Sequence, residues 1–170
     1  MVINHNRKFD LLYEVSTAVI ALLLGIVFYW FIRPQGSAAF LSLMPAFPPD
    51  QDLSFFGRWL GWLPTFLHVF AFSLLTFVTL GRRHLLPACI LWGVINALFE
   101  LGQALPAGIV LLLPELFNIR SYFANGVFDL LDLGACVIGA WSAWALLRHR
   151  VLANDKGPAA MDREYFSTQR

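Results

Sequence analysis

Several ionisable or amide side chains lie within apolar stretches of this sequence, where they are energetically costly. Asp129 and Asp132 stand three residues apart in "FDLLD", and Glu100 and Gln103 stand three apart in "FELGQ". On a helix, that spacing puts both members of each pair on one face. A carboxyl group in apolar surroundings can act as an acid or base, hold a cation, or accept hydrogen bonds from a polar ligand. These residues are therefore the first candidates for a functional site.

Three further polar side chains complete the candidate set, namely His68 in "FLHVF" and Arg120 and Asn125 in "IRSYFAN". His68 and Arg120 are candidate cations for the nearby acids. Asn125 is a suitable N-cap for the helix that follows it, and Asp129 in the first turn would complement the positive helix end. Asp132 lies too far into the helix for capping to explain it.

The composition indicates one membrane-embedded domain. Of the 170 residues, 58% are hydrophobic and only 14% are charged, whereas about a quarter are charged in a soluble protein. A net charge of +1 predicts no nucleic-acid partner. Cys89 and Cys136 lack CxxC spacing and are expected to pack as small apolar residues.

Four stretches reach the roughly 20 apolar residues that a membrane-spanning helix needs. They are Leu11–Ile32, Trp62–Leu80, Leu85–Leu105 and Val127–Leu147. We therefore predict an all-α fold, a four-transmembrane-helix bundle formed by residues 1–147. Residues 148–170 are expected to form a polar, mobile cytoplasmic tail.

The connections between these spans differ in character. Arg33–Gly61 is rich in proline and aromatic residues and is expected to lie along the membrane interface. Pro106–Phe123 is too short and too proline-broken to span, so it is predicted to be an interfacial or re-entrant helical outer loop. The "GRRH" sequence at residues 81–84 is expected to form a tight turn.

The placement of Lys and Arg predicts the orientation. With both termini in the cytoplasm, nine of the 12 Lys and Arg residues lie on that side, and only Arg33, Arg58 and Arg120 lie outside. The predicted location is the bacterial inner (plasma) membrane, with multiple passes. Glu14, near the cytoplasmic end of the first span, is expected to snorkel or to pair with Arg7 or Lys8.

In this orientation the polar residues of three spans fall at one depth. His68 lies about two turns below the outer end of the second span, Glu100 and Gln103 lie in the last turns of the third, and Asp129 and Asp132 lie in the first turns of the fourth. An acid at the centre of a span costs about 2.5–3.5 kcal/mol by insertion scales. We therefore predict that these side chains face inward and share one polar cluster in the outer half of the bilayer.

The ordered segments "LPTFLHVFAFSLLTF", "FELGQ" and "GVFDLLDLGACVIGA" resemble those of the VanZ-like family, small helical membrane proteins named for a teicoplanin-resistance determinant. The resemblance extends from about Leu63 to Leu147. It departs from the family pattern in lacking an Asp-Lys pair before the histidine. It implies a role in the cell envelope and in antibiotic tolerance, and its motif positions fall on these residues: His68, Glu100, Gln103, Arg120, Asp129, Asp132 and Gly139.

Three functional hypotheses follow. The first is a polar pocket in the outer leaflet that binds an amphiphile, either a lipid headgroup or a lipoglycopeptide tail. The second is a structural or accessory subunit of a larger membrane complex, with partner membrane proteins or a homodimer and with the acids as interhelical hydrogen-bonding clamps. The third is an intramembrane acid–base enzyme using Glu100 or Asp132.

A non-enzymatic role is favoured over the third hypothesis. The sequence has no serine–histidine pair, no GxSxG elbow and no zinc motif. No cofactor and no metal are therefore expected, although His68 with the acids has the ligand types that zinc accepts. A haem held between two histidines is disfavoured, because only His68 lies at membrane depth. A transporter is disfavoured because the inner half of the bundle offers few polar residues.

Overall fold

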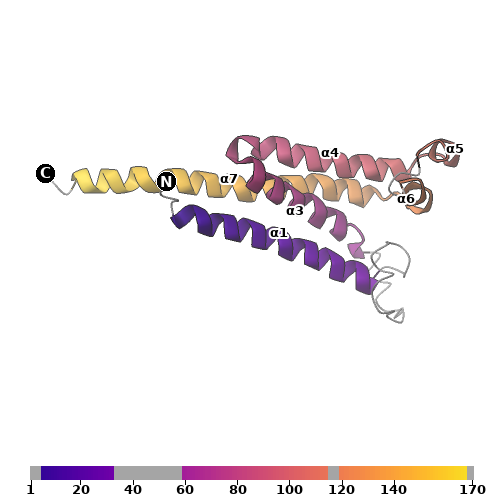
Figure 1. The fold of residues 1–170 in the computed structure, drawn as a ribbon, viewed down its shortest axis with the longest axis horizontal. Helices are drawn as coiled ribbons and strands as arrows, with labels where there is room; N and C mark the ends of the chain where they lie inside the picture. Colours follow the sequence, from indigo (N-terminus) through magenta and orange to yellow (C-terminus); the bar gives the residue numbers. More distant parts are fainter. Residues whose placement is uncertain (1–4, 33–58, 115–118, 168–170) are drawn as a thin grey trace.

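Four long helices form most of the part of the chain that the computed structural model describes, which is residues 5–32, 59–114 and 119–167. They are α1 (His5–Ile32), α3 (Leu63–Leu80), α4 (Leu85–Gln103) and α7 (Leu130–Ser167). Each contains a segment long and apolar enough to cross a membrane (Figure 1). The predicted all-α fold with four membrane-spanning helices is confirmed.

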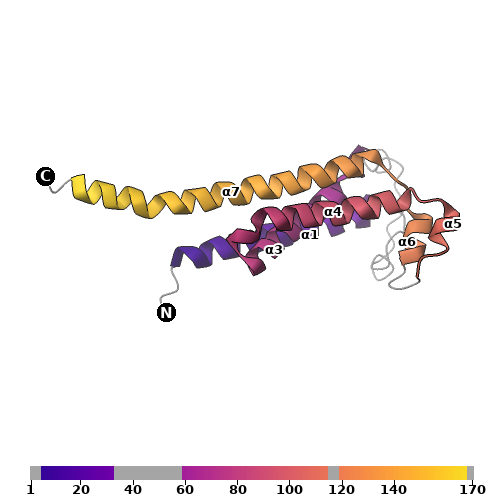
Figure 2. The same ribbon diagram turned by 90° about the horizontal axis from the view of Figure 1, so that it is seen from above.

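Helix α3 is the central element of the bundle, because it packs against α1, α4 and α7. Helix α4 also packs along α7, whereas the main partner of α1 is α3 alone. Figures 1 and 2 show the connection between α3 and α4 at the same end of the bundle as the start of α1, with α5 and α6 at the opposite end. We call these the η2 end, after the 3-10 helix η2 (Arg82–His84), and the α6 end.

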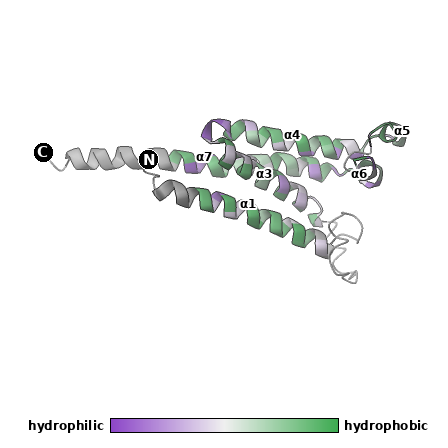
Figure 3. Cartoon of the chain, viewed as in Figure 1, coloured by the Kyte–Doolittle hydropathy of each residue, from purple (hydrophilic) through white to green (hydrophobic). Residues whose placement is uncertain are grey.

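Small residues let the helices of this core approach one another closely. Ala18, Ala71 and Ala143, one from each of three helices, have no exposed surface. The tightest approach is at Gly139 of α7, where a Cβ atom would lie 2.9 Å from the carbonyl oxygen of Phe66 in α3. Such contacts between small residues are typical of helix association in membranes. Figure 3 shows that hydrophobic residues predominate along the coloured parts of the four long helices, and large apolar side chains on each of them are exposed.

The predicted tight turn at residues 81–84 is present. Gly81 adopts φ 85°, a left-handed conformation that favours glycine, and its N–H donates to the carbonyl of Phe77 at 2.8 Å. The single turn η2 follows, and α4 begins at Leu85. This short connection fixes α3 and α4 as antiparallel neighbours and leaves Arg82 and Arg83 exposed at the η2 end.

The structure differs from the sequence prediction at several helix ends. The fourth span was predicted over Val127–Leu147, but α7 begins at Leu130 and continues to Ser167, so most of the predicted polar tail is helical. The third span was predicted to reach Leu105, but α4 ends at Gln103. Because Pro106 cannot donate an N–H and excludes the α conformation from the preceding residue, the helix ends before it.

The structure describes the two outer connections to different extents. Most of Arg33–Gly61 lies outside the described residues. In the described parts of Pro106–Phe123, which exclude residues 115–118, the predicted helical outer loop contains α5 (Ala107–Val110) and the beginning of α6 (Ile119–Asn125). Helix α6 packs against both α4 and α5. The two short helices therefore cover the end of the bundle where the candidate acids lie.

Candidate functional site

Glu100 of α4 and Asp132 of α7 are both buried at the α6 end. Each residue is only 6% exposed. One carboxylate oxygen of each, Oε2 of Glu100 and Oδ1 of Asp132, is fully enclosed by protein. Both acids therefore point into the bundle, as the cost of exposing an acid to lipid predicts.

The packing of α4 against α7 places these two acids opposite each other. Gly93 of α4 faces Ala140 and Cys136 of α7, with a glycine Cβ position 3.4 Å from the Ala140 Cβ and 3.7 Å from the Cys136 carbonyl oxygen. The two helices are antiparallel (Figure 1). Moving seven residues from Gly93 toward the α6 end reaches Glu100, and moving the same distance on α7 reaches the turn that contains Asp132.

Cys136 follows Asp132 by one turn on the same face of α7, the face that packs against α4. Its carbonyl oxygen lies opposite Gly93 of α4, and the residue is 1% exposed. We call Glu100, Asp132 and Cys136 the carboxylate pocket, as a name for this set of residues.

Aromatic rings of α4 and α6 cluster over the last turn of α4, next to Glu100 in the chain. A Cβ on Gly102 would lie 2.5 Å from Cε1 of Phe123, so the ring of Phe123 packs directly on the α4 backbone. Phe99, Tyr122 and Phe123 form mutual ring contacts with centroid separations of 5.5 to 5.8 Å. This cluster, the aromatic cover, fills the surface above the last turn of α4.

Gln103 and Arg120 fasten the short helices over the bundle. Gln103 Nε2 donates a hydrogen bond to the Tyr122 hydroxyl at 3.0 Å, and its side chain packs on Gly126. Arg120 donates from Nε and one terminal nitrogen to the carbonyl of Leu113, at 3.0 and 2.7 Å. In these contacts both residues position the aromatic cover and bridge α4, α6 and the α5 turn.

The prediction that Asn125 caps the fourth helix is wrong. Asn125 is the last residue of α6, and it is exposed. The cap is Asp129, whose carboxylate accepts the N–H of Leu131 at 2.9 Å and whose carbonyl accepts the N–H of Asp132 at 3.1 Å. Asn125 therefore ends α6, and Asp129, which accepts the N–H of the second residue of α7, is the N-cap of that helix.

His68 lies at the edge of this region. Its Nδ1 donates to the carbonyl of Pro64 one turn earlier, at 3.0 Å. The imidazole stacks on Phe72 at 5.8 Å, and Phe72 stacks on Trp92 of α4 at 4.6 Å. Continuing that antiparallel register toward the α6 end puts His68 within about one turn of Glu100. His68 thus faces α4, with its second ring nitrogen available for other contacts.

Sequence reasoning missed Glu14 as a buried acid. It is 7% exposed on α1, near the η2 end, where it was expected to snorkel or to pair with Arg7 or Lys8. A signal was present in the sequence, because Glu14, Ala18, Ala21 and Gly25 follow helical spacing and form the face that packs on α3. Glu14 lies at the end of the bundle opposite to the carboxylate pocket, and we use it below as a matched reference.

Within the described residues, no group of three or more His, Cys, Asp or Glu side chains is arranged to hold a metal ion. The site therefore consists of two buried acids and a thiol beneath an aromatic cover. Comparison with protein-family models found no match, and comparisons with curated proteins and with solved structures found none either.

Proposed function

We propose that the protein binds an amphiphile from the outer leaflet of the bacterial plasma membrane and that the carboxylate pocket is the polar anchor of that site. In this proposal both termini are cytoplasmic, as the distribution of Lys and Arg favours. The α6 end then lies in the outer half of the bilayer. Membership of the VanZ-like family, with its link to the cell envelope, is part of the same proposal.

The observation that carries the proposal is the burial of Glu100 and Asp132 on facing helices, α4 and α7, of a bundle whose helices are long and apolar enough to span a membrane. Ionisable groups at membrane depth usually mark a binding or transfer site. An amphiphile whose headgroup carries amine or hydroxyl donors would supply the hydrogen atoms that two carboxylates accept. Lipid headgroups and lipoglycopeptides share this chemistry.

The aromatic cover would contact the apolar part of the same ligand. Phe99, Tyr122 and Phe123 are partly exposed and lie directly beyond the pocket. Because Phe123 packs on Gly102 without an intervening side chain, displacement of this one ring would open a route from the membrane to Glu100. Gln103 and Arg120 would hold α6 in place during binding.

The test uses protein purified in detergent and measures thermal stabilisation by added amphiphiles. Phosphatidylethanolamine has an amine donor, phosphatidylcholine has a cation without a donor, and a lipoglycopeptide tests the second ligand source. A ligand at 100 times its Kd should stabilise the wild type by about 2.7 kcal/mol. Glu100→Gln and Asp132→Asn should each weaken binding by about 10- to 100-fold, because hydrogen bonds to charged groups contribute about 1.5–3 kcal/mol.

Glu14→Gln is the matched control, because it also neutralises a buried acid of the bundle, at the opposite end. It should leave stabilisation by the ligand unchanged. Equal responses of all three variants would contradict the proposal, as would a wild type that none of the amphiphiles stabilises. If a second membrane protein co-purifies in stoichiometric amount, the accessory-subunit hypothesis is supported instead.

A further inference from the structure

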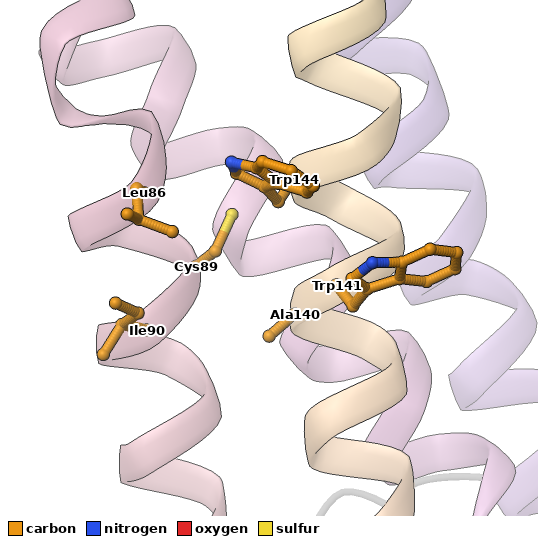
Figure 4. A pocket seen from close by; sticks show the side chains of 6 residues that line it. All are labelled: Leu86, Cys89, Ile90, Ala140, Trp141 and Trp144. Atoms are coloured by element: carbon orange, nitrogen blue, oxygen red, sulfur yellow. The ribbon is translucent and has the colours of Figure 1, made fainter.

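A second, separate feature lies between α4 and α7 toward the η2 end. It is an apolar cavity of about 270 Å³ that is open to the outside of the bundle, lined by Leu86, Cys89, Ile90, Ala140, Trp141 and Trp144 (Figure 4). We call it the α4–α7 groove. Cys89 is 2% exposed and forms its floor, whereas Leu86, Ile90 and Trp141 are 53%, 55% and 63% exposed and form its rim.

The groove faces the membrane and not the interior of the bundle. Its exposed rim residues lie within the apolar segments of α4 and α7 that are long enough to span. Figure 4 shows the indole of Trp144 reaching from α7 toward Cys89 of α4, so that Trp144 bounds the groove on the side nearer the η2 end. The carboxylate pocket lies at the other end of these two helices, so the two sites are separate.

Arginine residues gather where the groove approaches the η2 end. Arg148 follows Trp144 by one turn of α7, and its guanidinium carbon lies 4.8 Å from the centre of a Trp144 ring. On the facing helix, Arg82 and Arg83 of η2 immediately precede the turn that carries Leu86. All three arginines are exposed. The sequence places no acid in residues 81–99 or 133–154, the segments that line the groove and carry the three arginines.

We propose that the α4–α7 groove binds an acyl chain of an anionic phospholipid, with the lipid phosphate at Arg148, Arg82 and Arg83. The dimensions agree with this assignment. From Ala140 to Arg148 is eight residues of helix, or about 12 Å, so a chain in the groove extends along α7 to a headgroup at the arginines. Arginine suits the phosphate because its planar guanidinium donates two parallel hydrogen bonds to phosphate oxygens.

Charge complementarity is what selects this occupant over others. A hydrocarbon chain alone, or an apolar helix of another protein, would fill the groove without using the arginines. Membranes contain anionic lipids in the leaflet that basic segments face. Trp144 belongs to both halves of the site, because one part of it lines the groove and its ring contacts the Arg148 guanidinium. The site lies at the η2 end and does not depend on the function proposed for the carboxylate pocket.

The experiment counts lipids bound to the full-length protein by native mass spectrometry. Phosphatidylglycerol and phosphatidylcholine with identical acyl chains are titrated separately, so that only the headgroup differs. The wild type should retain one phosphatidylglycerol per chain with at least tenfold preference over phosphatidylcholine. Arg148→Gln should reduce that affinity about fivefold, as expected for one basic residue near an anionic lipid. The double variant Arg82→Gln/Arg83→Gln should reduce the affinity for phosphatidylglycerol more than Arg148→Gln does.

Matched variants separate the groove from the general surface. Ile90→Trp fills the groove and should abolish the retained lipid, whereas Leu98→Trp adds the same ring to an exposed site on α4 that is 61% exposed and outside the groove. Arg150→Gln removes a cation from the same end of α7, but one that lies over Tyr13 of α1 at 3.4 Å. Both controls should bind phosphatidylglycerol as the wild type does.

Several outcomes would overturn the proposal. Equal retention of the two lipids by the wild type, a measurement that needs no variant, would show that the headgroup is not recognised. Equal effects of Arg148→Gln and Arg150→Gln would show a non-specific charge effect. A homodimer that Ile90→Trp dissociates would show that a second copy of the chain occupies the groove.

Discussion

The contact of Gly139 with α3 gives the sharpest prediction about stability. In Gly139→Ala the new methyl carbon would lie 2.9 Å from the carbonyl oxygen of Phe66 and 3.2 Å from the Cβ of Val69. Neither atom is the end of a flexible side chain, so α3 and α7 must move apart by a few tenths of an ångström. Overpacking of this kind costs about 1–3 kcal/mol. We expect Gly139→Ala to lower the free energy of unfolding by that amount.

Two other glycines of the bundle, in less crowded surroundings, provide a graded series with Gly139. A Cβ at Gly134 of α7 meets nothing within 4 Å, and one at Gly93 of α4 lies 3.4 Å from the Ala140 Cβ, a contact at the edge of the ordinary range. Gly134→Ala should be neutral or stabilising by up to about 1 kcal/mol, because alanine favours the helix. The free energy of unfolding of Gly93→Ala should lie between those of Gly134→Ala and Gly139→Ala.

The assay is reversible unfolding in mixed micelles, followed by far-ultraviolet circular dichroism, with all variants purified in the same detergent. The order Gly134→Ala, Gly93→Ala, Gly139→Ala, from most to least stable, is the expected result. If Gly139→Ala is as stable as Gly134→Ala, then α3 and α7 are not in the close contact described, and the packing argument for the bundle fails.

Three further predictions concern the fastenings of the bundle. Gly126→Ala would put a methyl carbon 2.5 Å from Oε1 of Gln103. Because the Gln103 side chain is flexible, the loss in free energy of unfolding should be near the low end of about 1–3 kcal/mol. Thermal unfolding of the double variant with Gln103→Ala should show that this stability is recovered. Trp92→Phe removes the 2.7 Å hydrogen bond to the Thr76 hydroxyl and should lower the free energy of unfolding by about 0.5–1.5 kcal/mol. A double-mutant cycle with Thr76→Val that gives no coupling energy would argue against this bond. Arg120→Lys loses the contact of two guanidinium nitrogens with the Leu113 carbonyl. Limited proteolysis between α5 and α6 should then be about tenfold faster, as the loss of one hydrogen bond to a charged group predicts. An unchanged proteolysis rate would contradict the proposed role of Arg120 in holding α6 in place.

The four spans could be predicted from the sequence because a bilayer sets a minimum length for apolar helices, and Leu11–Ile32 and its three counterparts meet it. The helix ends were less predictable. Val127 and Phe128 are apolar and were assigned to the fourth span, yet Asp129 caps α7 at Leu130. An aspartate side chain competes locally for backbone N–H groups, and hydrophobicity alone does not show where that competition succeeds.

The inward orientation of the two acids was predictable from the sequence, whereas the contacts around them were only partly predictable. Glu100 and Asp132 were expected to face inward, and both are buried. Cys136 was expected to pack as a small apolar residue, and it is buried one turn from Asp132. Arg120 was named as a candidate cation for the acids, and its contact with the carbonyl of Leu113, seven residues earlier, was not foreseen. Such loop contacts depend on the path of α5 and α6, which spacing does not encode.

The arrangement of the carboxylate pocket also has a consequence for biogenesis. Glu100 and Asp132 are separated by 32 positions in the sequence, so a ribosome working at about 5–20 residues per second synthesises them roughly 2–6 s apart. The two acids also leave the ribosome in that order and with that delay, so the third span reaches the membrane before the turn of the fourth span that carries Asp132 has emerged. The glutamate must therefore travel protonated, or be sheltered by the insertion machinery, until the last span arrives and encloses it.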